Sequence, residues 1–250
     1  MNVRLALGVT GLCVALTASQ ALAAPHKAKG KGKGAGPVVC NQINDPTPDA
    51  IVDLTNGLAK KGQQDDTSDI ISADLASNAK DLTAVIRLKS LAGSPTVWPE
   101  AHFYLLQWTV PDHATPVYLG GTIDPNPASA AFGTQFYFGD VANFPSSATT
   151  VFIGFNVDQA AKVKGTVSTD KATVTLSVPI SQLSGYGTFS PGTRFSDITA
   201  ESQVLINGPD TPANLPLFGG TLAQGVSTPD TDLAAKPYVA GTPSCVKPGA

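Results

Sequence analysis

Apolar and polar residues alternate with a period of two along much of the chain, which is typical of β-strands with one buried face. The clearest stretch is residues 172–180, where Ala172, Val174, Leu176, Val178 and Ile180 alternate with Thr173, Thr175 and Ser177. We expect the first set to point into a core and the second set to point away from it. Residues 163–167 precede this stretch across a polar turn at Ser168–Lys171, which predicts a hairpin.

The same alternation predicts strands on either side. Residues 71–75 place Ile71, Ala73 and Leu75 on the expected core face, and residues 82–88 follow across a turn at Asn78–Asp81. Residues 102–110 are apolar on both faces, which is typical of a central strand. Further strands are expected in residues 117–119, 134–138, 151–157 and 194–206.

Turns rich in Pro, Gly, Asn and Asp separate these segments, because proline fixes φ and glycine admits positive φ. Residues 48–60 have a weak helical spacing, with Ile51, Leu54 and Leu58 on one face. From residue 209 the chain is proline-rich and is expected to be loop. About eight to ten short strands with frequent turns predict one all-β domain, an antiparallel β-sandwich or jelly roll spanning residues 37–250.

The first 36 residues differ from the rest. Arg4 is followed by an uncharged stretch that ends at Ala21-Leu22-Ala23, so residues 1–23 are interpreted as a secretory signal peptide. A membrane anchor is the alternative that the length permits. Residues 24–36 alternate Lys and Gly and predict a flexible tether, either a solvated linker or a contact for an anionic polymer. The protein is therefore expected to be secreted.

Charge argues against one class of partner. The chain of 250 residues carries a net charge of −3, but the first 36 residues hold five of its 16 Lys and Arg and none of its 19 Asp and Glu. The remainder therefore carries about −8, whereas binding of duplex nucleic acid needs the opposite sign. Its acidic residues are Asp except for Glu100 and Glu201, which suits strands and loops.

Two of the three cysteines lie outside the predicted signal peptide, at Cys40 and Cys245. Because an exported chain meets an oxidising compartment, we expect them to form one disulfide that joins the two ends of the domain. The alternatives are two free thiols or a bond to a partner. Their spacing, with His102 and His113 between them, gives no zinc pattern.

Five segments together resemble the secreted bacterial DOMON-like and family 9 carbohydrate-binding-module-like β-sandwich domains. They are Asn44–Asp49, Asp69–Leu75, Leu82–Leu88, Phe103–Trp108 and Gly165–Pro179, within residues 44–206. The resemblance implies an accessory module of the kind found in secreted enzymes, with a structural calcium near the first strands. It also implies sugar binding by a pair of tryptophans.

Residues 65–69 are the candidate calcium site. Asp65, Asp66 and Asp69 place three carboxylates beside Thr and Ser hydroxyls just before a strand, and such hard oxygen ligands suit Ca²⁺. Asp45 and Asp49 form a second acidic group that could complete it. The spacing is not that of an EF-hand, and an ordinary solvated acidic loop is the alternative.

Sugar binding would rest on aromatic rings, for which the candidates are Trp98, Tyr104, Trp108 and Tyr118. Trp108 shares strand parity with Tyr104, which also fits a core position, whereas Trp98 precedes a proline in an expected loop. Motifs of hydrolases, zinc enzymes and phosphate-binding loops are absent from the sequence.

These observations favour a secreted, non-catalytic module that binds a carbohydrate or cell-envelope ligand. A structural surface protein is the first alternative. A glycoside-active enzyme with Glu100 and Glu201 as acid and base is the second.

Overall fold

The computed structural model describes residues 38, 40–52, 63–92, 100–123, 134–143, 153–206 and 226–249. The chain divides into a first unit, Met1–Gly34, and a second compact unit, Ala35–Ala250. The predicted signal peptide and tether lie outside the described residues. Within the described residues, no helix has both the length and the apolar character that crossing a membrane would require.

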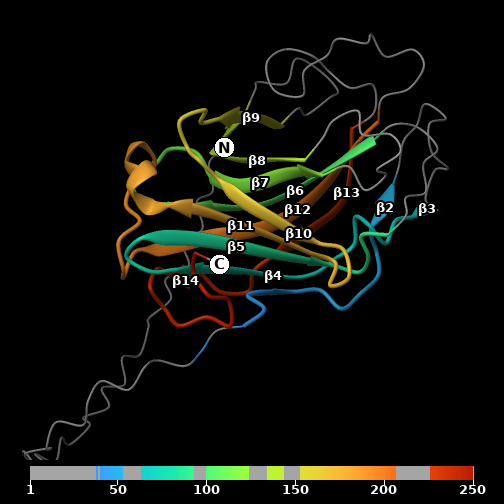
Figure 1. Ribbon diagram of the computed structural model, residues 1–250, viewed down its shortest axis with the longest axis horizontal. Helices are drawn as coiled ribbons and strands as arrows, with labels where there is room; N and C mark the ends of the chain where they lie inside the picture. Colours follow the sequence, from blue (N-terminus) through green and yellow to red (C-terminus); the bar gives the residue numbers. More distant parts are fainter. Residues whose placement is uncertain are drawn as a thin grey trace, which may run out of the picture. The chain divides into compact units, whose positions relative to one another are not determined.

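Two antiparallel sheets form the second unit (Figure 1). The first sheet has the strand order β1 (Ile43–Asn44), β4 (Ile70–Ser77), β5 (Asp81–Leu88), β11 (Thr173–Pro179) and β10 (Lys164–Ser168). The second has the order β13 (Val226–Leu233), β12 (Arg194–Ile206), β6 (Glu100–Thr109), β7 (Val117–Ile123), β8 (Gln135–Asn143) and β9 (Ile153–Val157), and β14 (Tyr238–Val239) also pairs with β12. The predicted all-β antiparallel sandwich is thus confirmed.

Shorter elements lie between these strands along the chain. The strands β2 (Ile51–Val52) and β3 (Gln63–Gln64) pair with each other, and the 3₁₀ turns η1 (Ile180–Gln182) and η2 (Ser184–Tyr186) follow β11. The helix expected over residues 48–60 is therefore wrong at Ile51–Val52, where the backbone is extended. Residues 53–62 lie outside the described residues.

The core between the sheets follows the predicted alternation in β11. Val174, Leu176 and Val178 are fully buried in it, and Thr173 and Thr175 on the opposite face are half-buried. Ser177 shares the outer face but is also buried, and its hydroxyl accepts a hydrogen bond from Thr83 Oγ1 and donates one to the Leu82 carbonyl of β5. The period of two therefore identifies the face of each side chain, while burial also depends on what covers the outer face.

The predicted face of β4 is wrong at its first residues. Ile70 is fully buried and Ile71 is exposed, whereas Ala73 and Leu75 lie in the core as expected. The register of β4 against β5 shifts between Ile70 and Ser72, so the two strands are out of step by one residue there. Such a bulge reverses the side-chain faces before it and keeps those after it.

The loop expected from residue 209 is wrong over Val226–Leu233, which forms β13 and pairs with β12. The register of this pair shifts between Ser202 and Val204, where β12 faces an extra residue of β13. Pro229 lies in that stretch, and proline is tolerated at bulges and edge strands because it has no N–H to contribute. β13 is the outermost strand of its sheet on that side.

The opposite side of the sandwich is closed by an aromatic ring against a glycine. An atom at the Cβ position of Gly165 in β10 would lie 2.5 Å from the ring of Phe136 in β8. Only glycine allows this approach of the two sheets, since Phe136 belongs to the second sheet and Gly165 to the first.

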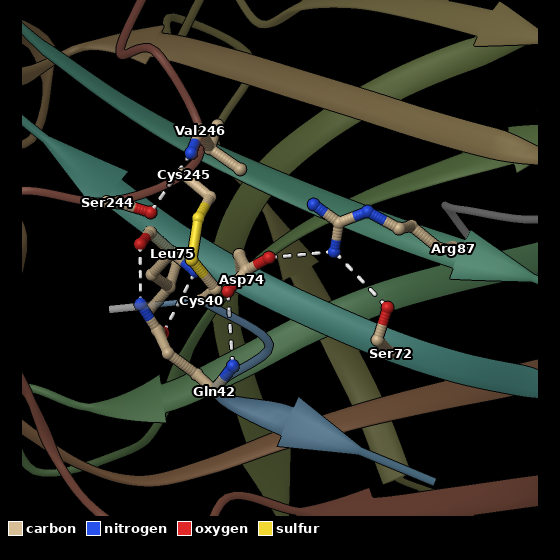
Figure 2. The surroundings of a disulfide bond; sticks show 9 residues. All are labelled: Cys40, Gln42, Ser72, Asp74, Leu75, Arg87, Ser244, Cys245 and Val246. Carbon is tan, nitrogen blue, oxygen red and sulfur yellow. Dashed lines mark hydrogen bonds and ion pairs between the residues drawn. A yellow bond between two sulfur atoms is a disulfide. The ribbon is translucent and has the colours of Figure 1, made fainter. Parts of the chain in front are cut away.

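The two ends of the domain are joined on the outer face of the first sheet (Figure 2). Cys40 and Cys245 form a disulfide with a Cα–Cα distance of 5.2 Å, which confirms the predicted pairing. Val246 packs on Ala76 of β4 and Val85 of β5, so the C-terminal segment covers this face.

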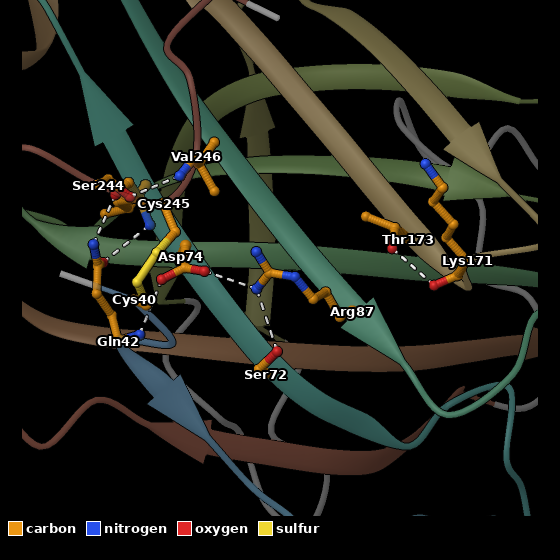
Figure 3. A network of polar contacts seen from close by, with 11 residues as sticks. Cys40, Gln42, Ser72, Asp74, Arg87, Lys171, Thr173, Ser244, Cys245 and Val246 are labelled. Carbon is orange, nitrogen blue, oxygen red and sulfur yellow. Dashed lines mark hydrogen bonds and ion pairs between the residues drawn. A yellow bond between two sulfur atoms is a disulfide. The ribbon is translucent and has the colours of Figure 1, made fainter. Parts of the chain in front are cut away.

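Polar contacts fasten the N-terminal segment beside the disulfide (Figure 3). The side chain of Gln42 donates to the Leu75 carbonyl at 2.7 Å and accepts from Leu75 N at 2.9 Å. Gln42 N donates to the buried carboxylate of Asp74, which also accepts from Arg87 at 2.7 Å. The disulfide therefore joins segments that the sheet already holds in place.

Candidate metal centre

Four aspartate carboxylates meet at the edge of the sandwich where β4 and β13 approach each other. One oxygen from each of Asp45, Asp49, Asp69 and Asp230 lies within 4.8 Å of the others. Asp45 follows β1, Asp49 precedes β2, Asp69 precedes β4 and Asp230 lies in β13. The group therefore bridges the two sheets, because β1 and β4 belong to the first and β13 to the second.

A tight turn of residues 65–68 presents Asp69. The carboxylate of Asp65 accepts hydrogen bonds from the backbone N–H and hydroxyl of Thr67, at 3.0 and 2.5 Å, and from the hydroxyl of Ser68, at 2.6 Å. Lys89 N donates to the Asp69 carbonyl at 2.8 Å and ties the end of the turn to the end of β5. Asp65 thus shapes the turn and uses both of its oxygens to do so.

The backbone also orients the other members. Ile70 N donates to Asp230 Oδ2 at 2.7 Å, which holds this carboxylate of β13 at the start of β4. Asp45 Oδ1 accepts from Thr47 N at 2.9 Å, while Asp45 Oδ2 is buried and has no hydrogen-bond partner in the described part of the chain. In both residues one oxygen is occupied by the protein and the second can bind a ligand.

Asp69 is the member of the group that burial affects most. Its side chain is fully buried, and neither of its carboxylate oxygens accepts a hydrogen bond from the residues that the structure describes. Lys89 Nζ lies 3.8 Å from Asp69 Oδ2 but forms a closer ion pair with Asp66, at 2.7 Å. A buried carboxylate with so little compensation costs several kcal/mol of folding stability when it is charged. A bound cation would offset this cost.

The protonation equilibria agree with that requirement. Burial raises the pKa of Asp69 above its usual range, and Lys89 offsets only part of this effect. Burial raises the pKa of Asp230 to about 6. Burial and the neighbouring charge of Asp230 raise the pKa of Asp232, two residues along β13, to about 7. A bound cation would reverse these shifts, because it favours the charged carboxylates.

The donor set matches calcium among the common divalent cations. Ca²⁺ takes six to eight oxygen ligands at about 2.3–2.6 Å, so opposite ligands lie about 4.6–5.2 Å apart, a span that accommodates the observed group. Mg²⁺ needs shorter octahedral bonds and keeps several waters, which suits a cage of four carboxylates less well. Transition metals favour nitrogen or sulfur ligands, which this group lacks.

The sequence analysis located this region, but of the three carboxylates proposed as its main ligands, only one belongs to the group. Asp69 belongs to the group, and Asp45 and Asp49 join it as expected. Asp65 and Asp66 do not, because Asp65 serves the turn and Asp66 is exposed beside Lys89. Asp230 was missed. The signal that could have found it is Asp230-Thr-Asp232, which puts two carboxylates on one face if the segment is a strand.

Three of the four aromatic candidates for sugar binding lie in the interior of the protein. Tyr104, Trp108 and Tyr118 are all fully buried. Tyr104 donates its hydroxyl to the Thr67 carbonyl, Trp108 packs against Phe195, and Tyr118 joins a cluster with Phe103 on the other face of the second sheet. None of the three can therefore present a ring face to a sugar. Trp98 lies outside the described residues.

The proposed acid–base pair is also separated. In the register of β12 against β6, Glu201 faces Leu105 and Glu100 faces Ile206. The two glutamates are thus five positions apart along the sheet, roughly 17 Å at 3.4 Å per residue. Glycosidases place their two carboxyl groups about 5–10 Å apart on the same site, so Glu100 and Glu201 do not form such a pair.

Comparison with models of protein families, with curated proteins and with solved structures finds no match.

Proposed function

We propose that this protein is a secreted, non-catalytic β-sandwich module that binds a calcium ion through Asp45, Asp49, Asp69 and Asp230. The observation that carries the proposal is Asp69, a fully buried carboxylate that lies beside three other carboxylates and has no hydrogen-bond partner among the described residues. A cation supplies the missing charge. The disulfide between Cys40 and Cys245 supports export to an oxidising compartment.

Within that class, we propose an extracellular binding or accessory role, with a structural surface protein as the competing function. A carbohydrate ligand would depend on Trp98 or on other surfaces, since Tyr104, Trp108 and Tyr118 belong to the cores. Screening of the calcium-loaded protein on an array of glycans and cell-wall polymers separates the two. Saturable binding supports the module, and its absence across the array supports the structural role.

The cation site is tested by calorimetric titration of chelator-treated protein with Ca²⁺ and, separately, with Mg²⁺. We expect one Ca²⁺ per chain and much weaker binding of Mg²⁺, with a Ca²⁺ dissociation constant no weaker than the roughly 10⁻⁴–10⁻³ M of extracellular modules. Asp69→Asn should abolish the heat of binding, and Asp170→Asn, in an exposed turn between β10 and β11, should leave it unchanged. Equal binding by both variants would contradict the proposed site.

A further inference from the structure

The edge strand β13 pairs irregularly with its own sheet near the proposed cation site. Among the described strands its sheet neighbour is β12 alone, and the register of this pair shifts between the pairs Ser202–Asp230 and Val204–Ser227. Pro229 lies inside that shift and has no N–H to donate. The ladder of hydrogen bonds is therefore interrupted next to Asp230.

On its other side β13 approaches the first sheet through charged residues. Asp230 accepts the hydrogen bond from Ile70 N and shares the group with Asp45, Asp49 and Asp69. Asp232 Oδ2 is buried, has no hydrogen-bond partner within the described segments and lies close enough to these carboxylates to interact with their charges. Lys89 provides a positive charge on the side of Asp69. Without a cation, β13 thus brings like charges onto an edge that is already negative.

We propose that the cation is a latch for β13, so that binding of Ca²⁺ and docking of this strand against β4 are one coupled event. The inference rests on the proposed calcium site and adds its structural consequence. A ligand that contacts both Asp69 and Asp230 stabilises the docked arrangement by its preference for that arrangement. The strands β5 and β11 lie inside the first sheet and contribute no member of the group, so their stability depends on the cation much less.

Hydrogen exchange of the whole disulfide-bonded protein tests the latch, with detection by mass spectrometry of peptic peptides. In chelator, we expect amides of Val226–Leu233 to exchange roughly tenfold or more faster than in millimolar Ca²⁺. Amides of β5 and β11 serve as the internal control and should change little. Mg²⁺ at the same concentration should protect β13 less than Ca²⁺ does.

A variant separates the latch from general stabilisation. Asp230→Asn should exchange in β13 at the same fast rate with and without Ca²⁺, while Asp170→Asn should behave like the unmodified protein. If Asp230→Asn does not fold, the comparison of the unmodified protein in Ca²⁺, Mg²⁺ and chelator still decides the question.

Three results would overturn the latch. Calcium binding by calorimetry with unchanged exchange of β13 would reject the latch and leave the calcium site standing. Equal slowing of exchange in β13, β5 and β11 would show stabilisation of the whole domain instead. No heat of binding and no change in exchange would reject both the site and the latch.

Discussion

The backbone N–H of Ile70 donates to the carboxylate of Asp230 at 2.7 Å, across 160 positions of sequence. This bond joins the first residue of β4 to the edge strand of the opposite sheet. It also fixes the position of the Asp230 carboxylate. This carboxylate would bind the cation together with that of Asp69, the residue before Ile70. Residues 69 and 70 therefore supply one proposed ligand, Asp69, and orient another, Asp230.

Replacement of Asp69 should raise the stability of the metal-free protein and remove the stability that calcium adds. In chelator, Asp69→Asn should unfold at a higher urea concentration than the unmodified protein, because the variant removes a buried charge that only a long ion pair with Lys89, at 3.8 Å, compensates among the described residues. In calcium at about 100 times the dissociation constant, the unmodified protein should gain about 2.7 kcal/mol and the variant almost nothing. A variant that is several kcal/mol less stable in chelator would show that Asp69 has a stabilising partner without metal.

Replacement of Asp65 and replacement of Asp66 should cost different amounts of folding stability, although the two residues are neighbours. Asp65→Ala removes the acceptor of three hydrogen bonds in a buried turn and should cost about 1–3 kcal/mol for each donor left unpaired, measured by urea denaturation. Asp66→Ala removes an exposed ion pair with Lys89 and should cost less than about 1 kcal/mol. Loss of calcium binding in Asp66→Ala would make Asp66 a ligand after all.

Charges on the two faces of β11 should have unequal effects. Val174→Asp places a carboxylate in the core and should cost several kcal/mol, while Thr175→Asp, on the half-buried outer face, should cost much less. Thermal melting of the two variants provides the comparison. Similar melting temperatures would contradict the assigned faces of the strand.

Removal of the disulfide should destabilise the domain without changing its fold. The bond closes a loop of 205 residues, for which the chain-entropy model gives about 5 kcal/mol as an upper value. The double variant Cys40→Ser, Cys245→Ser should therefore unfold at a clearly lower urea concentration, with an unchanged far-ultraviolet circular dichroism spectrum. Mass spectrometry of the unmodified protein under alkylating conditions should find no free thiol at either position.

Glu201 should make stability depend on pH. Burial raises its pKa above the ordinary 4.5, although Gln203 Nε2 donates to it at 2.6 Å. The folded state therefore keeps the proton longer than the unfolded state, and stability is lost as pH rises from 4.5 through the folded pKa. Glu201→Gln, compared in saturating calcium, should lack this loss. Denaturation curves whose difference does not vary with pH would contradict the prediction.

The sequence predicted the sandwich because local alternation survives in most strands. In β11 and β5 the alternating residues contact one continuous core, so the pattern at Val174 or Ile86 could be interpreted directly. It failed at Ile71 because a bulge depends on the partner strand, which sequence alone does not specify. It missed β13 because that edge strand is polar and contains Pro229, features that are equally common in loops.

The candidate site was predictable only in part, for a related reason. Asp45, Asp49 and Asp69 lie within 25 residues of one another, so their density was visible in the sequence. Asp230 reaches them through the pairing of β13 with β12, a long-range contact that no local pattern encodes. The burial of Tyr118 was hidden similarly, because a second apolar cluster lies on the face of the sheet that faces away from the main core.

The two open sides of this sandwich are sealed by different chemistry. On one side, Phe136 rests on Gly165, and this apolar seam is indifferent to the ions in the surrounding fluid. On the other, the seam consists of carboxylates, whose mutual repulsion depends on the cations present. If the carboxylates bind a cation as proposed, loss of that cation should loosen the sandwich on this side alone. The composition of the surrounding medium would then help to determine the structure.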